Sequence, residues 1–129
     1  MKPSSAKAKG RKLQQDTRDT LLEHAPSLEP DDIRSTSMGA PGEDIQLSPA
    51  ARKIYPFSVE CKNVEKLNIW GALDQASENA GDNYPIVVFK KNGRAPHVAI
   101  SFEKFMEIYS RSLNNGSGNV EVPAKADSD

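Results

Sequence analysis

The sequence has one cysteine, few aromatic residues and no excess of charge, and these shortages exclude several protein classes. Cys61 is the only cysteine, so the chain cannot form an intramolecular disulfide or a cysteine-rich zinc site, which fits a reducing compartment. With 17 basic and 18 acidic residues the net charge is -1, so nucleic acid could be contacted only through local clusters. No apolar run is long enough for a membrane span and no signal peptide is evident, so we expect a soluble cytoplasmic protein with no membrane partner.

The length of 129 residues leaves room for one small domain. Residues 1–9 are rich in lysine and contain no acid, which predicts a flexible basic arm. Residues 112–129 consist largely of small, polar and acidic residues and predict a disordered tail. The domain is therefore expected over residues 10–111.

Hydrophobic periodicity within this domain predicts alternating helices and strands. Helices are expected over 10–25, 68–80 and 101–111, and strands over 32–38, 43–47, 55–62, 85–90 and 97–100. Residues 48–53 read as a turn or a short helical segment. The apolar run 85–90 predicts a central strand, and Asn92-Gly93 predicts the hairpin turn that follows it. The fold class is α/β, with a mixed β-sheet flanked by helices.

The last predicted helix carries Phe102, Phe105, Met106 and Tyr109 at helical spacing, which we interpret as core packing. The two histidines, His24 and His97, lack metal-ligand spacing and are expected to be structural or superficial.

The chemistry is expected in the stretch from Asp44 to Lys62. Glu60 is followed two residues later by Lys62 on a predicted strand, so both side chains share one face, with Cys61 on the other. Ionisable groups in such an apolar setting need a partner or a metal. The alternative is a cross-strand salt bridge on a solvated face.

Asp44, then Glu60-Cys61-Lys62 on the following strand, then a helix with Gln75, resembles the PD-(D/E)XK nuclease superfamily. The likeness is greatest to its small Holliday junction resolvases and related phage-type nucleases, and it spans about residues 10–109. It implies a restriction-endonuclease-like core in the order α-β-β-β-α-β-β-α. It also implies a bacterial or phage-infected host cell.

The resemblance implies a Mg²⁺-dependent endodeoxyribonuclease, with Mn²⁺ able to substitute. Asp44, Glu60 and the backbone carbonyl of Cys61 would bind the metal. Lys62 would orient the attacking water or neutralise the scissile phosphate. Gln75 would contact water or phosphate, and no small-molecule cofactor is implied.

The implied substrate is DNA, branched if the resolvase resemblance holds, and two strands cut symmetrically imply a homodimer. The resemblance places Ser35 and Ser37 in a loop against the DNA, with turn serines as the alternative. Further candidate phosphate contacts, or alternatively solvated charges, are Arg52, Lys53, Lys66, Lys90, Lys91 and Arg94.

Two positions depart from the resolvase pattern. Such resolvases usually have a glutamate on the first helix, whereas this chain has Gln14 and Gln15, which are weaker metal ligands. Glu43 precedes Asp44 where proline is usual, and we expect it to face away from the site. The alternative functions are a repair or restriction-like nuclease on duplex or flapped DNA, and a catalytically silent DNA-binding module of the same fold.

Overall fold

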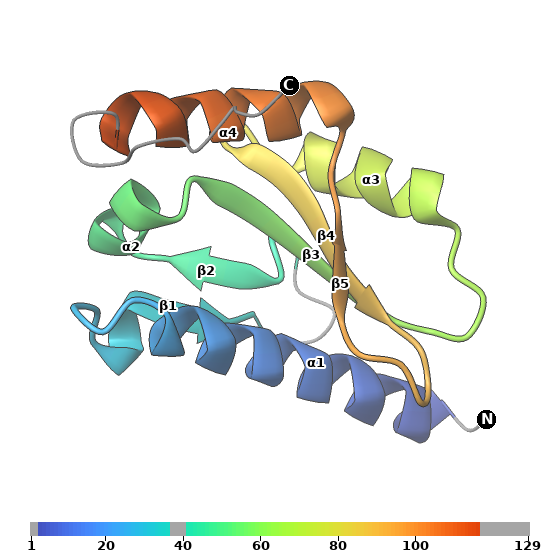
Figure 1. The fold of residues 1–129 in the computed structure, drawn as a ribbon. Helices are drawn as coiled ribbons and strands as arrows, with labels where there is room; N and C mark the ends of the chain where they lie inside the picture. Colours follow the sequence, from blue (N-terminus) through green and yellow to red (C-terminus); the bar gives the residue numbers. More distant parts are fainter. Residues whose placement is uncertain (1–2, 37–40, 117–129) are drawn as a thin grey trace.

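The computed structural model describes residues 3–36 and 41–116. It is a mixed α/β structure whose helices flank small sheets (Figure 1). In chain order the elements are α1 (Pro3–Glu23), the 3-10 turn η1 (Pro30–Asp32), β1 (Ile33–Ser35), β2 (Ile45–Leu47), α2 (Pro49–Ile54), β3 (Phe57–Asn63), α3 (Ile69–Glu78), β4 (Tyr84–Lys90), β5 (His97–Ala99) and α4 (Phe102–Gly116). No helix in this part of the chain is long and apolar enough to cross a membrane.

The strands form two sheets. β1 and β2 pair antiparallel, and β3, β4 and β5 form a second sheet in that order. β3 and β4 are parallel with α3 as their crossover, whereas β4 and β5 are antiparallel. The central position predicted for residues 85–90 is confirmed, because β4 lies between the other two strands and Ile86, Val87 and Val88 are buried.

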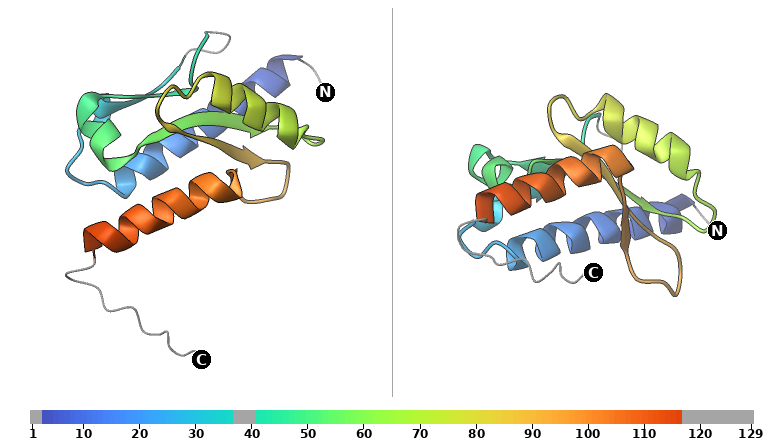
Figure 2. Two further views of the ribbon diagram at one scale, coloured as in Figure 1. Left: turned by 90° about the horizontal axis from the view of Figure 1, so that it is seen from above. Right: turned by 45° about the horizontal axis from the view of Figure 1, so that its top comes forward.

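Helices cover both faces of the three-stranded sheet (Figure 2). On one face Leu13 of α1 packs in a core cluster with Val59, Cys61 and Val88. On the other face α3 packs its small residues against Val87, with Phe89 at the border of that cluster. Alternate side chains of β3 therefore point to opposite faces of the sheet, one covered by α1 and the other by α3.

The first helix begins earlier than the sequence predicts. α1 starts at Pro3, so residues 3–9, expected in a flexible arm, belong to this helix. This segment contains no proline after Pro3, and Gly10 directly after it is the one glycine of α1, so helical hydrogen bonding propagates through it. Residues 1 and 2 lie outside the described part.

The segment between β2 and β3 is a short helix, the second of the two forms expected for residues 48–53. Ser48 caps it by accepting a hydrogen bond from the Ala51 amide at 3.1 Å, and Pro49 occupies the first helical turn. β1 and β2 are shorter than predicted, with three residues each. Residues 37–40, which include part of the predicted strand 32–38, lie outside the described part.

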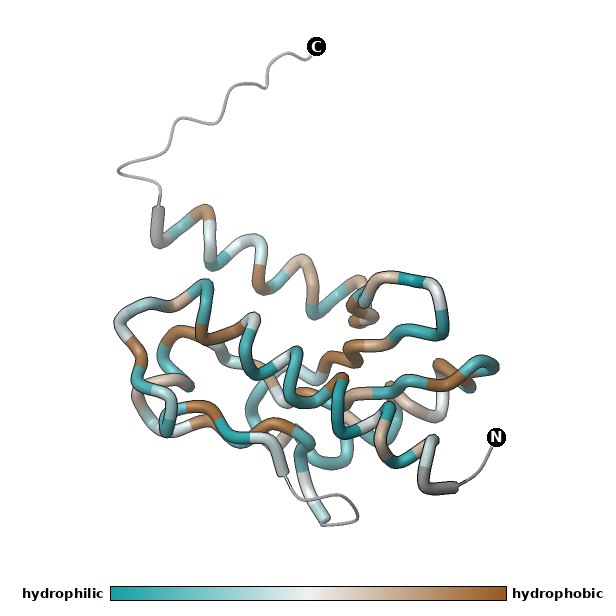
Figure 3. Tube along the Cα trace, turned by 90° about the horizontal axis from the view of Figure 1, so that it is seen from below, coloured by the Kyte–Doolittle hydropathy of each residue, from teal (hydrophilic) through white to brown (hydrophobic). Residues whose placement is uncertain are grey.

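The interpretation of the last helix is wrong. Phe102, Phe105, Met106 and Tyr109 of α4 are exposed to between 41% and 79%. Figure 3 shows hydrophobic positions recurring along this helix. Its opposite face meets the body of the protein, where Arg111 lies 5.8 Å from the centre of the Tyr84 ring. Residues 112–116, expected in the tail, continue the helix, and 117–129 lie outside the described part.

Candidate active site

β3 positions Glu60 and Lys62 as the sequence predicts. Val59 and Cys61 enter the core on the α1 side, so Glu60 and Lys62 lie on the side covered by α3. On the same side Ser58 donates a hydrogen bond to the Asn79 carbonyl, directly after α3. The two ionisable side chains are therefore held between a sheet and a helix rather than on a solvated face.

Asp44 lies beside β3 and bonds to it twice. Its backbone amide donates to the Val59 carbonyl at 3.0 Å, and its carboxylate Oδ2 accepts from the Cys61 amide at 2.7 Å. A side-chain oxygen thus takes the place that a strand carbonyl would have in a ladder. The sequence prediction that Asp44 meets the Glu60–Lys62 segment is confirmed.

Glu60 is the most perturbed acid of this group. It is 3% exposed, and burial raises its pKa to about 7, with the nearby Asp44 charge adding to the increase. Lys62 acts in the opposite direction, with its Nζ 3.6 Å from Glu60 Oε2. The Asp44 pKa is also raised, mainly by burial, against the Cys61 amide and the Lys62 charge. One ammonium does not offset two neighbouring carboxyls in a low-dielectric setting.

The donor set fits a hard cation that keeps much of its water. Mg²⁺ is commonly bound by one or two carboxylates together with substrate oxygens and water, and Asp44 and Glu60 supply two carboxylates. Among the described residues no group of three or more His, Cys, Asp and Glu side chains is arranged to hold a metal ion. Further ligands would have to be backbone carbonyls, such as the expected one at Cys61, or water.

The Cys61 side chain takes no part in this chemistry. It lies on the α1 side, with its Sγ 3.7 Å from the Thr17 hydroxyl, and burial raises the pKa of the thiol to about 12. A protonated, buried thiol is neither a good nucleophile nor a metal ligand. The expectation that this side chain is part of the core is confirmed.

The two glutamines of α1 differ in their surroundings. Gln14 is 5% exposed, and its Oε1 is a buried oxygen with no hydrogen-bond partner in the described part of the chain. Gln15 is exposed in a groove with Arg18 and Ser35. Arg18, one turn after Gln14 on the same face, donates to the Ile33 carbonyl, so this face of α1 is turned towards β1. Of the two glutamines, only Gln14 therefore has a buried side chain.

Other predicted site residues lie apart from the acidic pair. Gln75 is exposed on α3, and within the described residues its side chain makes no hydrogen bond to Asp44, Glu60 or Lys62. Ser35 is half-buried in the groove beside Gln15, whereas Ser37 lies outside the described part. Lys53 and Lys66 are exposed, as expected of phosphate contacts or solvated charges.

Arg52 is not the exposed cation that we expected. Its guanidinium donates to both carboxylate oxygens of Glu43, at 2.8 and 2.6 Å, and to the Phe57 carbonyl at 2.5 Å. One guanidinium nitrogen thus contacts both carboxylate oxygens, so the Arg52 charge is paired and is not free for a phosphate. It also engages Glu43 outside the acidic pair, in agreement with the expectation for that residue.

The sequence analysis missed Thr36, which supports the Asp44 segment. Thr36 is buried, its amide donates to the Asp44 carbonyl at 2.8 Å and its hydroxyl donates to the Glu43 carbonyl at 2.6 Å. Only its place at the end of a predicted strand could have indicated this, since threonine is common in both strands and turns. Comparison with known proteins adds no relative: no family model, curated protein or solved structure matches the chain.

Proposed function

We propose that the protein is a metal-dependent endodeoxyribonuclease with its active site at Asp44, Glu60 and Lys62. The observation that carries the proposal is the buried Glu60 carboxyl, whose pKa is raised to about 7 beside Asp44 and within 3.6 Å of Lys62. Two neighbouring carboxyl groups that are largely removed from water, with an ammonium group close to one of them, favour the binding of a divalent cation. A perturbed structural ion pair would not need the second carboxyl.

In this proposal each side chain has a distinct task. Asp44 and Glu60 hold Mg²⁺, or Mn²⁺ in its place, which supplies Lewis acidity and neutralises charge on the phosphate when bound. Lys62 donates to the attacking water or to a phosphate oxygen, so that charge develops beside an ammonium. Of the two glutamines on α1, Gln14 is the proposed further contact for a water of the site, because its buried Oε1 has no hydrogen-bond partner among the described residues. Gln75 is kept only as a contact for substrate, because its side chain is exposed.

We further propose that the core is restriction-endonuclease-like, of the PD-(D/E)XK kind. The support is the order of elements: a first helix, an antiparallel pair that delivers Asp44, a strand with Glu60 and Lys62, a crossover helix and a parallel strand. Branched DNA is the proposed substrate. Duplex or flapped DNA, and DNA binding without cleavage, are the alternatives that the experiment must separate.

A homodimer is the proposed assembly. α4 presents a stripe of Phe102, Phe105, Met106 and Tyr109 to solvent, while its polar face meets the body of the protein. An aromatic side chain buries about 150–250 Å² in a contact, and a standard interface buries about 800 Å² per partner. A second copy that covers this stripe would thus gain a large part of the area that a stable dimer needs.

The test is incubation of the full chain and Mg²⁺ with linear, flapped and four-way DNA. Wild type should cut, and Glu60→Gln and Lys62→Ala should each lower the rate by at least about a hundredfold, as expected for loss of a group that stabilises the transition state. Glu78→Gln removes an exposed charge and Lys104→Ala a half-buried one, both elsewhere on the molecule, and both variants should cut normally. Equal cutting by all five proteins contradicts the site, and indifference to the four-way junction contradicts the branched substrate.

A measurement of metal binding that does not depend on cleavage distinguishes a catalytically silent DNA-binding module from an incorrectly assigned active site. Mg²⁺ should raise the melting temperature of wild type and leave Glu60→Gln unchanged, because only a site with both carboxylates binds the ion. DNA binding and a Mg²⁺-dependent shift without any cutting would favour the silent module. Absence of the shift in wild type contradicts the metal site itself.

A further inference from the structure

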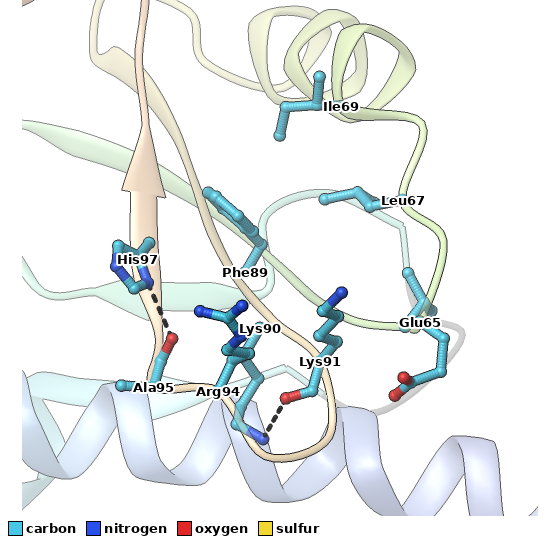
Figure 4. A pocket seen from close by; sticks show the side chains of 10 residues that line it. Glu65, Leu67, Ile69, Phe89, Lys90, Lys91, Arg94, Ala95 and His97 are labelled. Atoms are coloured by element: carbon cyan, nitrogen blue, oxygen red, sulfur yellow. Dashed lines mark hydrogen bonds between the residues drawn. The ribbon is translucent and has the colours of Figure 1, made fainter.

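A cavity of about 520 Å³ opens between the β4–β5 loop and the segment that leads into α3 (Figure 4). Its volume is within the range of small-molecule binding sites, which is about 300–1,000 Å³. The loop contributes Lys91 and Arg94, and the opposite wall contributes Leu67 and Ile69. In Figure 4 the Arg94 and Lys91 side chains extend from the loop towards the space in front of Phe89 and Leu67.

The cavity is positively charged although the chain as a whole is not. Lys90, Lys91 and Arg94 line it, and in the described part of the chain none of them forms an ion pair with a carboxylate. The one acid at its edge, Glu65, is engaged with the loop, since its Oε2 accepts from the Asn92 amide at 2.8 Å. Lys90 Nζ donates to the Lys91 carbonyl at 3.2 Å, which leaves Lys91 and Arg94 as the cations available to an anion.

The other part of the cavity is apolar and includes aromatic surface. Phe89 lies beside His97, with ring centroids 6.2 Å apart and planes tilted by 37°. His97 Nδ1 lies 2.9 Å from the Ala95 carbonyl, which can only accept, so this nitrogen carries the hydrogen. The cavity therefore combines a flat ring, aliphatic side chains and cations, which suits a ligand that is both aromatic and anionic.

The cavity and the candidate active site are related through neighbouring strands of one sheet. Phe89 of β4 is the register partner of Lys62 of β3, and in a parallel pair such partners lie side by side. Phe89 belongs to the face of the sheet that α3 covers, which is also the face of Glu60 and Lys62. The cavity therefore opens on the same face of the sheet as Lys62 and one strand away from it, although Lys62 is not among its lining residues.

We propose that this cavity binds an unpaired nucleotide of the DNA strand beside the scissile phosphate. Its base lies against Phe89 and the aliphatic wall, and its phosphate meets Lys91 and Arg94. A paired base is stacked within the duplex and cannot enter a concave pocket, so the cavity selects strands with an extruded or unpaired nucleotide. This inference rests on the proposed nuclease function and defines its substrate more closely.

The test measures binding without metal, so that it does not depend on cleavage. Two duplexes are compared in chelator, one fully paired and one with a single unpaired 2-aminopurine, whose fluorescence reports stacking. Wild type should bind the second duplex about tenfold more tightly and change its fluorescence. Lys91→Ala with Arg94→Ala should remove both effects and reduce the salt dependence of binding by about 0.7 in log-log slope, as the loss of one neutralised phosphate predicts.

The matched control is Lys12→Ala with Lys104→Ala, which removes the same charge at an exposed position on α1 and a half-buried one on α4 and should retain the preference. Equal binding of the two duplexes by wild type, or a preference that survives the loss of Lys91 and Arg94, overturns the inference. Deoxyadenosine monophosphate that binds as tightly as the unpaired duplex overturns the strand as the source of the nucleotide. Failure to cut DNA would instead count against the proposed function, because no arm of this test requires cutting.

Discussion

Glu60 combines burial, a neighbouring carboxyl and an ammonium, so its proton affects the stability of the fold. Its pKa lies at about 7 in the folded protein against an ordinary value of 4.5. Between these values the folded chain holds a proton that the unfolded chain has released. The free energy of unfolding must therefore fall as the pH rises through this interval, and the raised pKa of Asp44 acts in the same direction.

This relation gives a prediction for Glu60→Gln in the absence of metal. At about 1.4 kcal/mol per pKa unit, ionised Glu60 lowers the stability of wild type by roughly 3 kcal/mol above pH 7. The amide carries no charge, so the variant should be the more stable protein at pH 8 and should show a flatter pH profile. Urea unfolding at pH 5 and pH 8 measures it, with Glu78→Gln as the control. A wild-type stability that rises from pH 5 to pH 8 would contradict the raised pKa.

Gln14 and Gln15 provide a second test at single residues. Gln14→Ala removes the buried, unpartnered Oε1 and should slow DNA cleavage about tenfold or more if that oxygen holds a water of the site. Gln15→Ala changes an exposed side chain one residue away on the same helix and should leave the rate unchanged. Single-turnover rates at saturating Mg²⁺ compare the two. Equal rates for both variants would leave Gln14 without a part in the chemistry.

Single residues differ in how far the sequence could predict them. The shared face of Glu60 and Lys62 follows from the two-residue period of a strand, and the structure has it. The role of Cys61 as a donor to Asp44 depends on where β2 begins beside β3, which is set by tertiary packing. The pairing of Arg52 with Glu43 is equally non-local and was beyond any pattern in the sequence.

At the scale of elements, periodicity predicted which segments are helices and strands, but not where the apolar face of α4 points. Spacing shows that Phe102, Phe105 and Met106 share a face, and it is silent on whether that face meets the core. The polar face of α4 contacts the body instead, through Arg111 beside Tyr84. The early start of α1 was likewise missed, because lysine-rich segments are compatible with both helix and arm.

The exposed stripe of α4 gives a prediction for assembly. Phe102 is 79% exposed, so Phe102→Asp should leave the melting temperature almost unchanged while it converts the proposed dimer to a monomer in gel filtration with light scattering. Trp70→Ser is the matched control, since Trp70 is 75% exposed on α3. A wild-type chain that is monomeric at micromolar concentration contradicts the dimer, and a monomer produced by Trp70→Ser alone moves the interface to α3.

At the scale of the whole molecule, Asp44 connects the two-stranded sheet to the three-stranded sheet. Asp44 follows the segment outside the described residues and meets the middle of β3 through its amide and its carboxylate. Sequence reasoning predicted a mixed sheet flanked by helices. It could not predict the division into two sheets, because strand pairing depends on register and not on composition.

Because Asp44 directly precedes β2 of one sheet and Glu60 lies on β3 of the other, the candidate active site is complete only when the β1–β2 hairpin has folded against β3. β3, α3 and β4 are contiguous in the chain and form a local unit, whereas Asp44 must be brought to β3 by the closing of a separate hairpin. Contacts of this kind form with the entropy cost of ordering the intervening loop. A molecule whose hairpin has opened keeps Glu60 and Lys62 but loses the second carboxyl. The Cys61 amide, which is protected only while Asp44 is in place, would then exchange its hydrogen with solvent at the rate at which the site opens.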